Sequence, residues 1–339
     1  MDGPSWAWPF TPWRNVAAGL SAWRSRMNFK TIHDIHHCFD HALQPVETIS
    51  SGDTRCFDIQ DASGGLIQKE SQADILTRLP HDALNPVCGP LFIEDADPGD
   101  VIEIELEDFE PGAWGWTGLI PGFGLLADDF TQPWLKISEY DSESVYFRDD
   151  IVIPFRPFAG TIGLAPAEPG QHSIVPPRLC GGNLDIRDLV KGSKLYLPVQ
   201  VRGGLLSIGD THACQGDGEV CGTAVETGMK ATATIRLHKG DRILAPMFDM
   251  PPVERDQSLN EGFIVTTGVG ADLMQGARDA VRFMMDRLVK KAGMEEEMAY
   301  ALCSVAGQLR ISEIVDQPNW VVSCYMPKAI FKSTSLKAI

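Results

Sequence analysis

Between about residue 30 and residue 265, hydrophobic and polar positions alternate with the two-residue period of half-buried β-strands. The clearest case is Val101–Asp108 (VIEIELED), in which isoleucine or leucine alternates with glutamate directly after the turn residues Asp97–Asp100. We expect further strands at Arg55–Ala62, at Lys194–Val201 and, as two strands joined at residues 238–241, in Ala231–Pro246. Short strands separated by turn signals predict an antiparallel β-sandwich or jelly-roll-like body.

Helical periodicity is confined to a few segments. Ala271–Gly293 repeats apolar residues at i, i+3 and i+4 and closes with two lysines and a glycine, which predicts an amphipathic helix with its stop signal. We also expect helices at Glu295–Gly307 and, with Ser71 as N-cap, at Ser71–Leu79. A last strand is expected at Trp320–Phe331. The predicted fold class is therefore mainly β with some α (α+β), with a smaller α+β part that carries the C-terminal helices.

The chain divides by composition into three segments that we expect to work as one functional unit. Residues 1–28 form a Trp-rich N-terminal arm with four tryptophans and three arginines, and they lack the basic start and apolar run of a signal peptide. Residues 29–265 form the β-rich body. Residues 266–339 form a helical segment and a final strand that pack onto this body.

Charge and cysteine usage narrow the class of protein. The 339 residues carry a formal net charge of −17, which argues against nucleic acid or an anionic membrane as the main partner. The eight cysteines contain no C-x-x-C pair, so they are expected to be reduced thiols in a cytoplasmic protein. No run of about 18 apolar residues is present, so the sequence predicts no membrane span.

One short stretch, Ser207–Gly222 (SIGDTHACQGDGEVCG), concentrates acids, a histidine and glycines. Asp210 and His212 are two residues apart, so on an extended chain both side chains point to one face and can reach one ion. Glu219 follows a Gly-Asp-Gly turn and can double back towards the same point. Ligands on neighbouring strands and tight turns converge at little cost in ordering entropy, which suits a metal site.

A second pair of residues, Asn183 and Asp185, follows two glycines and could complete the ligand shell. Imidazole and carboxylate ligands together fit a divalent ion such as zinc, with calcium or magnesium favoured if oxygen ligands dominate. Spacing alone leaves a structural alternative open, in which the acids cap turns and His212 satisfies a buried hydrogen-bond network.

Other candidate chemistry is weaker. His33–His41 holds four of the eight histidines, and His36 and Asp40 would share a face if this segment were a helix, but it could equally be a strand. The sequence has no G-x-S-x-G nucleophile elbow and no nucleotide-binding glycine motif. Cys221, two residues after Glu219, is a candidate thiol nucleophile, with a role as a small apolar filler as the alternative.

Several long motifs resemble those of the acetamidase/formamidase family, in one colinear pass from about residue 30 to 330. They are NPVCGPLFIEDADPGDVIEIEL (85–106), WGWTGLIPGFGLLADDF (114–130), GTIGLAPAEPG (160–170), GGNLDIRDLVKGSKLYLPV (181–199) and IGDTHACQGDGEVCGTAVET (208–227). Cys214 stands where the family has alanine. The Trp-rich arm lies outside the resemblance.

The resemblance implies hydrolysis of a short aliphatic amide, formamide or acetamide, to ammonia and the carboxylic acid. It also implies a β-rich fold with a smaller α+β part, a metal ion and a homo-oligomer. The family motifs are matched at His36, Asn183, Asp185, Asp210, His212, Asp217, Glu219 and Glu226.

Roles at these positions follow from the chemistry that amide hydrolysis needs. Asp185, Asp210 and His212 would bind a divalent ion, most simply zinc, with Asn183 and His36 as further ligands. Glu219 would be the general base, in a catalytic set with His212 and Asp217, and would hand the proton to the leaving ammonia.

Substrate contacts are expected from backbone N–H groups around Gly216 and Gly218, which could stabilise the oxyanion, and from Trp116 in the pocket. Two alternatives remain open. In the first, Cys221 is the nucleophile and the metal is structural. In the second, the protein is a non-catalytic β-sandwich that binds a small ligand or calcium. The expected partners are a small amide and further copies of the chain, with no nucleic acid and no membrane.

Overall fold

The computed structural model describes residues 29–124, 127, 131–148, 151–216, 219, 221–252, 262–294, 299, 308–328 and 331. The chain separates into two compact units, Met1–Lys30 and Thr31–Ile339. The predicted arm, residues 1–28, lies outside the described residues, so the fold below is that of the second unit.

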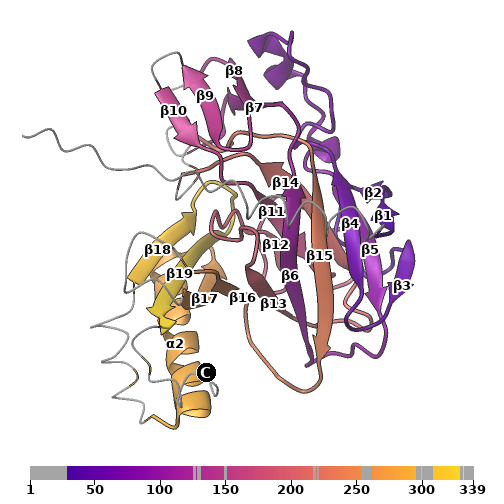
Figure 1. Ribbon diagram of the computed structural model, residues 1–339, viewed down its shortest axis with the longest axis vertical. Coiled ribbons are helices and arrows are strands. Elements are labelled where there is room, and N and C mark those ends of the chain that lie inside the picture. Colours follow the sequence, from indigo (N-terminus) through magenta and orange to yellow (C-terminus); the bar gives the residue numbers. More distant parts are fainter. Residues whose placement is uncertain are drawn as a thin grey trace, which may run out of the picture. The chain divides into compact units, whose positions relative to one another are not determined.

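The largest element is a nine-stranded sheet that contains segments from both ends of this unit (Figure 1). Its strands, in spatial order, are β1 (Thr31–Ile32), β4 (Thr54–Ile59), β15 (Met229–His238), β6 (Val101–Glu110), β13 (Lys194–Pro198), β16 (Met247–Met250), β17 (Phe263–Gly270), β19 (Trp320–Pro327) and β18 (Gln308–Glu313). The alternation in β6 has its expected effect, because Ile104 is fully buried and pairs with Leu195 and Ile235 on the neighbouring strands. The glutamates of β6 face the other way, where Arg236 bonds Glu103 at 3.0 Å.

A six-stranded sheet packs against this one and contains the candidate site. Its path is β12 (Gly181–Asn183), β11 (Phe158–Gly163), β14 (Leu206–His212), β5 (Val87–Ile93) and β2 (Ile35–His36), and β3 (Glu47–Ile49) pairs with β5. One hydrophobic cluster includes Ile104 and Ile235 of the first sheet with Ile162, Ile208 and Leu91 of the second. The two sheets therefore form the predicted sandwich. Every residue of β14 is buried, so polar side chains on this strand lie in the interior.

A four-stranded sheet extends the body at one end (Figure 1). Its order is β10 (Ile151–Pro154), β9 (Ser144–Arg148), β8 (Trp134–Tyr140) and β7 (Trp114–Leu119). The 3₁₀ turn η1 (Ala73–Thr77) contacts β7 and β8 of this sheet, and a second 3₁₀ turn, η2 (His81–Ala83), follows it along the chain. Leu76 of η1, Leu79 and Trp116 of β7 share a small hydrophobic cluster. This cluster becomes a wall of the pocket described below.

The helix α2 (Leu273–Ala292) covers β17 and β19 at the other end of the body (Figure 1). The Asp272 side chain caps it by accepting a bond from the backbone N–H of Gln275 at 2.6 Å, and Gly293 ends it with a φ of 66°. Its buried residues Ala280, Met284 and Leu288 pack on the sheet. The predicted helix at Ala271–Gly293 is thus confirmed.

The fold class, mainly β with some α, is confirmed, but two local predictions were wrong. Ser71–Leu79 contains the five-residue 3₁₀ turn η1 instead of an α-helix. The Ser71 hydroxyl, which we expected to cap that helix, accepts a bond from the backbone N–H of Gln68 and so closes the preceding turn. Within the stretch predicted as two strands, β15 ends at His238 and β16 starts only at Met247. The buried Asp100 accepts bonds from the Gly240 backbone and the Lys239 side chain, and these bonds hold the chain in a turn after β15.

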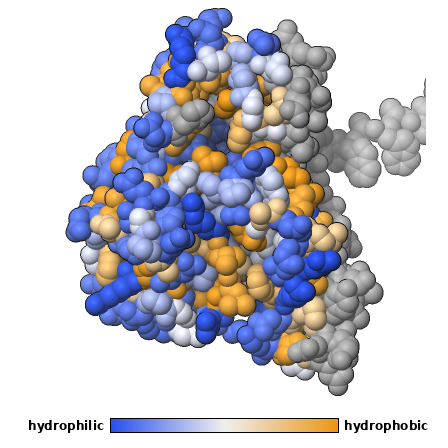
Figure 2. All heavy atoms as spheres, turned by 180° about the vertical axis from the view of Figure 1, so that it is seen from behind, coloured by the Kyte–Doolittle hydropathy of each residue, from blue (hydrophilic) through white to orange (hydrophobic). Residues whose placement is uncertain are grey.

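The predicted helix at Glu295–Gly307 lies outside the described residues apart from Ala299. Among the described residues, no helix combines the length and the apolar character needed to cross a bilayer. On the face seen in Figure 2, hydrophobic side chains are interspersed with hydrophilic ones.

Candidate active site

The end of β14 and the two segments that flank it bring buried acids and a histidine together. Asp185 follows β12, Asp210 and His212 are on β14, and Glu219 and Glu226 follow that strand. Their ligand atoms form two groups, and the atoms of each group lie within 4.8 Å of one another. One group consists of Asp185, His212 and Glu219, and the other of Asp210, His212 and Glu226. All five side chains belong to buried residues.

The backbone at three of these acids is left-handed. Asp185, Asp210 and Glu219 have φ angles of 46°, 54° and 47°, a region that costs energy for residues other than glycine. We expected an extended chain at Asp210 to place it on one face with His212. The two side chains do converge, with 3.3 Å between Asp210 Oδ1 and His212 Nε2, although Asp210, within strand β14, has a left-handed backbone and not an extended one. Such local strain at clustered polar groups is typical of functional sites.

The converging atoms lack hydrogen-bond partners within the described part of the chain. They are both carboxylate oxygens of Asp185, Oδ1 of Asp210, Nε2 of His212 and Oε2 of Glu226. His212 Nε2 is only 3.0 Å from Glu226 Oε2, yet the angles suit no hydrogen bond. Ligands at about 2.0–2.1 Å from a tetrahedral ion are about 3.3 Å from each other. Buried polar atoms that approach to this distance without bonding fit a common cation.

The tautomer of His212 also suits a metal ligand. The Gln215 amide donates from Nε2 to the Asp185 carbonyl at 2.8 Å, and because a carbonyl only accepts, this bond fixes the orientation of the amide. Its Oε1 therefore faces His212 Nδ1 at 2.9 Å and accepts a proton from it. The lone pair is left on Nε2, the atom that points to the acids.

The electrostatics of the cluster disfavour uncompensated carboxylate charges. Burial, followed by the charge of Asp210, raises the pKa of Asp185 well above its usual range. Burial and the charge of Asp185 do the same to the pKa of Glu219. Burial raises the pKa of Glu226 to about 7. For His212, burial opposes the imidazolium, but Glu226 and Asp210 outweigh it and the pKa is well above the ordinary value. A divalent cation would hold these carboxylates ionised and the imidazole neutral.

Space for this cluster depends on Gly160 of β11. A Cβ atom at this position would lie 2.8 Å from Asp210 Oδ2, 3.1 Å from His212 Cε1 and closer still to Asp185 Oδ1. Its carbonyl accepts a bond from the Asp185 backbone at 3.2 Å. Three candidate ligands thus pack directly against Gly160. Their carboxylate and imidazole groups fit zinc or a similar divalent ion.

Asn183 lies at the site, but other protein groups occupy both ends of its amide. Its Oδ1 accepts from the Thr161 hydroxyl, and its Nδ2 donates to Asp316 Oδ2 at 2.6 Å. Glu313 stands behind Asp316 and accepts from its backbone N–H at 2.6 Å. Asn183 therefore orients Asp316 in this structure.

His36 lies apart from the acid cluster. On β2, its Nδ1 is 2.7 Å from the Cys38 carbonyl and its Nε2 is 2.8 Å from the Ser207 hydroxyl. Both ring nitrogens are thus engaged, so the geometry does not support the prediction of His36 as a ligand of the same ion. Asp217 and Gly218 lie outside the described residues.

Gly216 and Cys221 flank the cluster without joining it. The Gly216 carbonyl accepts from the Glu219 backbone at 3.3 Å, and Gly216 lines a separate cavity with Arg156 and Arg187. The Cys221 thiol donates to the Thr223 carbonyl at 3.3 Å.

A pocket of about 280 Å³ leads to the cluster. Its inner end is lined by Asn183, Asp210, Glu219, Glu226 and Asp316, and its walls include Leu79, Leu84, Trp116, Ile120, Phe123 and Val175. Trp116, expected at the substrate, lines this pocket, and its indole Nε1 donates to Asp61 Oδ1 at 3.0 Å.

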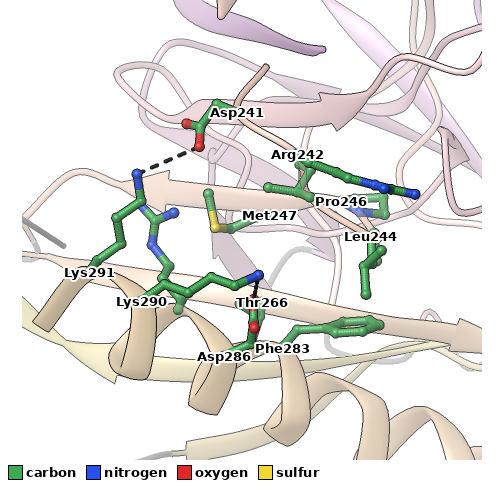
Figure 3. A pocket seen from close by; sticks show the side chains of 13 residues that line it. Asp241, Arg242, Leu244, Pro246, Met247, Thr266, Phe283, Asp286, Lys290 and Lys291 are labelled. Carbon is green, nitrogen blue, oxygen red and sulfur yellow. Dashed lines mark ion pairs between the residues drawn. The ribbon is translucent and has the colours of Figure 1, made fainter. Parts of the chain in front are cut away.

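A somewhat larger cavity, of about 330 Å³, lies between α2 and the segment before β16 (Figure 3). Two ion pairs lie at this cavity: Lys290 is 2.8 Å from Asp286 on the same helix, and Lys291 of α2 is 3.6 Å from Asp241. The described residues that line it include no histidine or cysteine. The chemistry is therefore concentrated in the smaller pocket.

Sequence reasoning missed part of this site. Glu226 was recognised as a motif position but given no role, although it approaches His212 as closely as Asp210 does. Asp316 and Gln215 were not considered. Asp316 is 133 residues from its partner Asn183, so no local spacing could indicate it.

Comparison with known proteins identifies the family of this chain. The model of the acetamidase/formamidase family matches residues 25–174 and 167–333. A formamidase of Methylophilus methylotrophus is 27% identical over 88% of this chain and 89% of its own. An acetamidase structure from Yersinia enterocolitica has 31% identity and a TM-score of 0.80, covering 90% of this chain and 94% of that one. One from Bacillus halodurans has 30% identity and a TM-score of 0.80, covering 88% and 96%. This chain belongs to the acetamidase/formamidase family and is an amidase.

Proposed function

We propose that this amidase hydrolyses the C–N bond of primary carboxamides, formamide and acetamide being the simplest, with water activated at a divalent cation. The observation that supports the cation is the set of buried, unpaired oxygen and nitrogen atoms at the inner end of the pocket. Asp210, His212 and Glu226 would hold it, with Asp185 beside them, and zinc suits such a set of ligands.

A bound divalent cation would supply Lewis-acid polarisation of the amide carbonyl and a lowered pKa for the attacking water. The protein supplies the remaining parts. Glu219 lines the pocket beside the ligands and, as general base, accepts a proton from the water. It then returns that proton to the leaving nitrogen, so that the amide and water yield ammonia and the carboxylic acid.

Asp316 and Asn183 complete the polar end of the pocket and are placed to orient the amide. Burial, followed by the charge of Asp185, raises the pKa of Asp316 well above its usual range. A protonated Asp316 side chain can donate a hydrogen bond, while Asn183 fixes its direction through the 2.6 Å bond to Oδ2. Trp116 is held by Asp61 and forms the wall next to this end.

The thiol alternative has less support in the geometry. The Cys221 thiol donates to a backbone carbonyl, and Cys221 is not among the described residues that line the pocket. A nucleophile must reach the carbonyl carbon of the substrate, so the described arrangement favours water over the thiol.

The test measures bound metal and ammonia release from formamide on one sample, before and after chelation. We expect activity to disappear on chelation and to return with one divalent ion. Glu219→Gln should lower kcat by at least about 100-fold, the typical share of a general base, while metal content stays unchanged. Glu103→Gln is the matched control, since Glu103 is also buried but pairs with Arg236 and His238 on the other sheet. Undiminished activity in metal-free enzyme would refute the proposal.

A further inference from the structure

The pocket is much larger than a formamide or acetamide molecule requires. Acetamide has four non-hydrogen atoms, whereas the pocket encloses about 280 Å³, close to the lower limit of about 300 Å³ for pockets that take drug-sized ligands. Once the amide group lies at the acidic end, most of this volume remains beyond the carbonyl carbon.

The walls of that remaining volume are apolar. Leu79, Leu84 and Ile120 come from two different segments and belong with Trp116 to one hydrophobic cluster. Phe123 and Val175 add to the same lining. Apolar walls gain free energy when an apolar group replaces water, in proportion to the area covered.

Contacts within the protein hold two of these wall residues in place. Trp116 is almost fully buried and held by the bond to Asp61. Phe123 lies against the backbone of Gly222, where a Cβ atom would come within 2.5 Å of ring atom Cε1. Gly222 has a φ of 86°, so glycine is needed both for this backbone and for the ring beside it. A preformed apolar cavity selects ligands by shape and polarity.

The charges of the pocket restrict the acyl group further. The described residues that line it include Asp210, Glu219, Glu226 and Asp316 but no lysine or arginine. A carboxylate on the acyl chain would therefore find no cationic partner at the walls and would lose its hydration.

We propose that this pocket selects primary amides of neutral, apolar acids with acyl groups larger than acetyl, and that Ile120 and its neighbours determine this specificity. The proposal rests on the proposed function, because the amide end of the substrate occupies the acidic inner end of the pocket. Under this proposal the apolar walls contact the acyl group, and formamide and acetamide are too small to make these contacts.

The first test is a substrate series on the metal-loaded wild-type protein. Each buried methylene should raise kcat/KM roughly fourfold, so isobutyramide should exceed acetamide at least about tenfold, with propionamide between them. Succinamate, which has as many carbon atoms as isobutyramide but carries a carboxylate, should fall below acetamide. A kcat/KM that declines from acetamide to isobutyramide while acetamide is hydrolysed would overturn the proposal and leave the proposed function standing.

A variant pair tests the wall itself. Ile120→Trp should fill the cavity and lower the isobutyramide-to-acetamide ratio of kcat/KM at least about tenfold. Leu244→Trp is the control, because Leu244 lines the other cavity (Figure 3) and is 59% exposed. An unchanged ratio in Ile120→Trp would refute the role of this wall.

If no amide is hydrolysed, a binding measurement distinguishes the proposed specificity of the pocket from the proposed hydrolysis. Isothermal calorimetry with acetamide and isobutyramide on the metal-loaded protein should show tighter binding of isobutyramide, and Ile120→Trp should abolish the difference. That result without turnover would support the apolar pocket and reject hydrolysis. Equal binding of both amides would overturn the specificity proposal.

Discussion

Gly160→Ala tests the site through its packing and leaves every candidate ligand in place. The added Cβ would lie 2.8 Å from Asp210 Oδ2 and nearer still to Asp185 Oδ1. An ordinary carbon–oxygen contact begins at about 3.4 Å, so Asp210 must retreat by about 0.6 Å. Metal sites keep their ligand distances within about 0.2 Å. The displacement is thus about three times the tolerance, and we expect both the cation affinity and the hydrolytic activity to fall.

The magnitude of the Gly160→Ala effect can be bounded. Loss of groups that only orient ligands lowers metal affinity about 10–100-fold, and displacement of two candidate ligands should reach at least that range. Overpacking should also lower the free energy of unfolding by about 1–3 kcal/mol.

Chelator competition measures the affinity, and denaturant unfolding measures the stability. Gly270→Ala is the control, because a Cβ there meets nothing within 4 Å. A Gly160→Ala protein that binds the cation and hydrolyses formamide like wild type would refute this account of the cluster.

Three further predictions concern stability and mechanism. A divalent cation at 100 times its dissociation constant should raise the free energy of unfolding by about 2.7 kcal/mol and Tm by roughly 4 °C in a thermal scan; an unchanged Tm would contradict a site formed only in the folded state. Cys221→Ser should leave kcat within about twofold in the ammonia assay, whereas near-complete loss would favour a thiol nucleophile. Burial opposes ionisation of Asp100, but bonds from Lys239 and from the backbone of Asp97 and Gly240 outweigh it and lower its pKa. The ionised form therefore stabilises the fold above its unfolded pKa of about 4, and this stability is lost as the pH falls through the lower folded value. Asp100→Asn should destabilise the protein at pH 7 and much less near pH 2, as measured by urea unfolding; an equal loss at both pH values would contradict this linkage.

The sequence predicted those elements whose side-chain pattern is decided locally. Val101–Asp108 alternates because one side of β6 faces the core, and Ala271–Gly293 carries its own cap and stop residues. The pattern failed at Ser71–Leu79, where too few residues turn towards the core and only Leu76 of η1 is buried. There, tertiary contacts with β7 and β8 decided the conformation.

The candidate site was predictable only as far as its residues are close in sequence. Asp210 and Glu219 each come close to His212, which the spacing indicated, but they do so in two different groups. Asp185 joins them because β12 and β14 both pair with β11, a relation that spacing does not contain. Asp316 depends on the chain returning after β18, more than 100 residues later, and it carries no local signal.

The same geometry explains why a purely structural, turn-capping role is the weaker interpretation of the acid cluster. Acids that merely cap turns have their oxygens bonded to backbone N–H groups, as Asp61 does with Ser63 at 2.9 Å. The oxygens of Asp185 receive no such bonds, although its backbone is left-handed and its side chain is buried. The left-handed backbone costs about 1–3 kcal/mol per residue, and buried oxygens without hydrogen bonds add to that cost. In a purely structural turn, substitution would remove residues that destabilise the fold in this way. The coincidence of both costs at Asp185 and Asp210 is accounted for if a cation binds there and offsets them in the folded state.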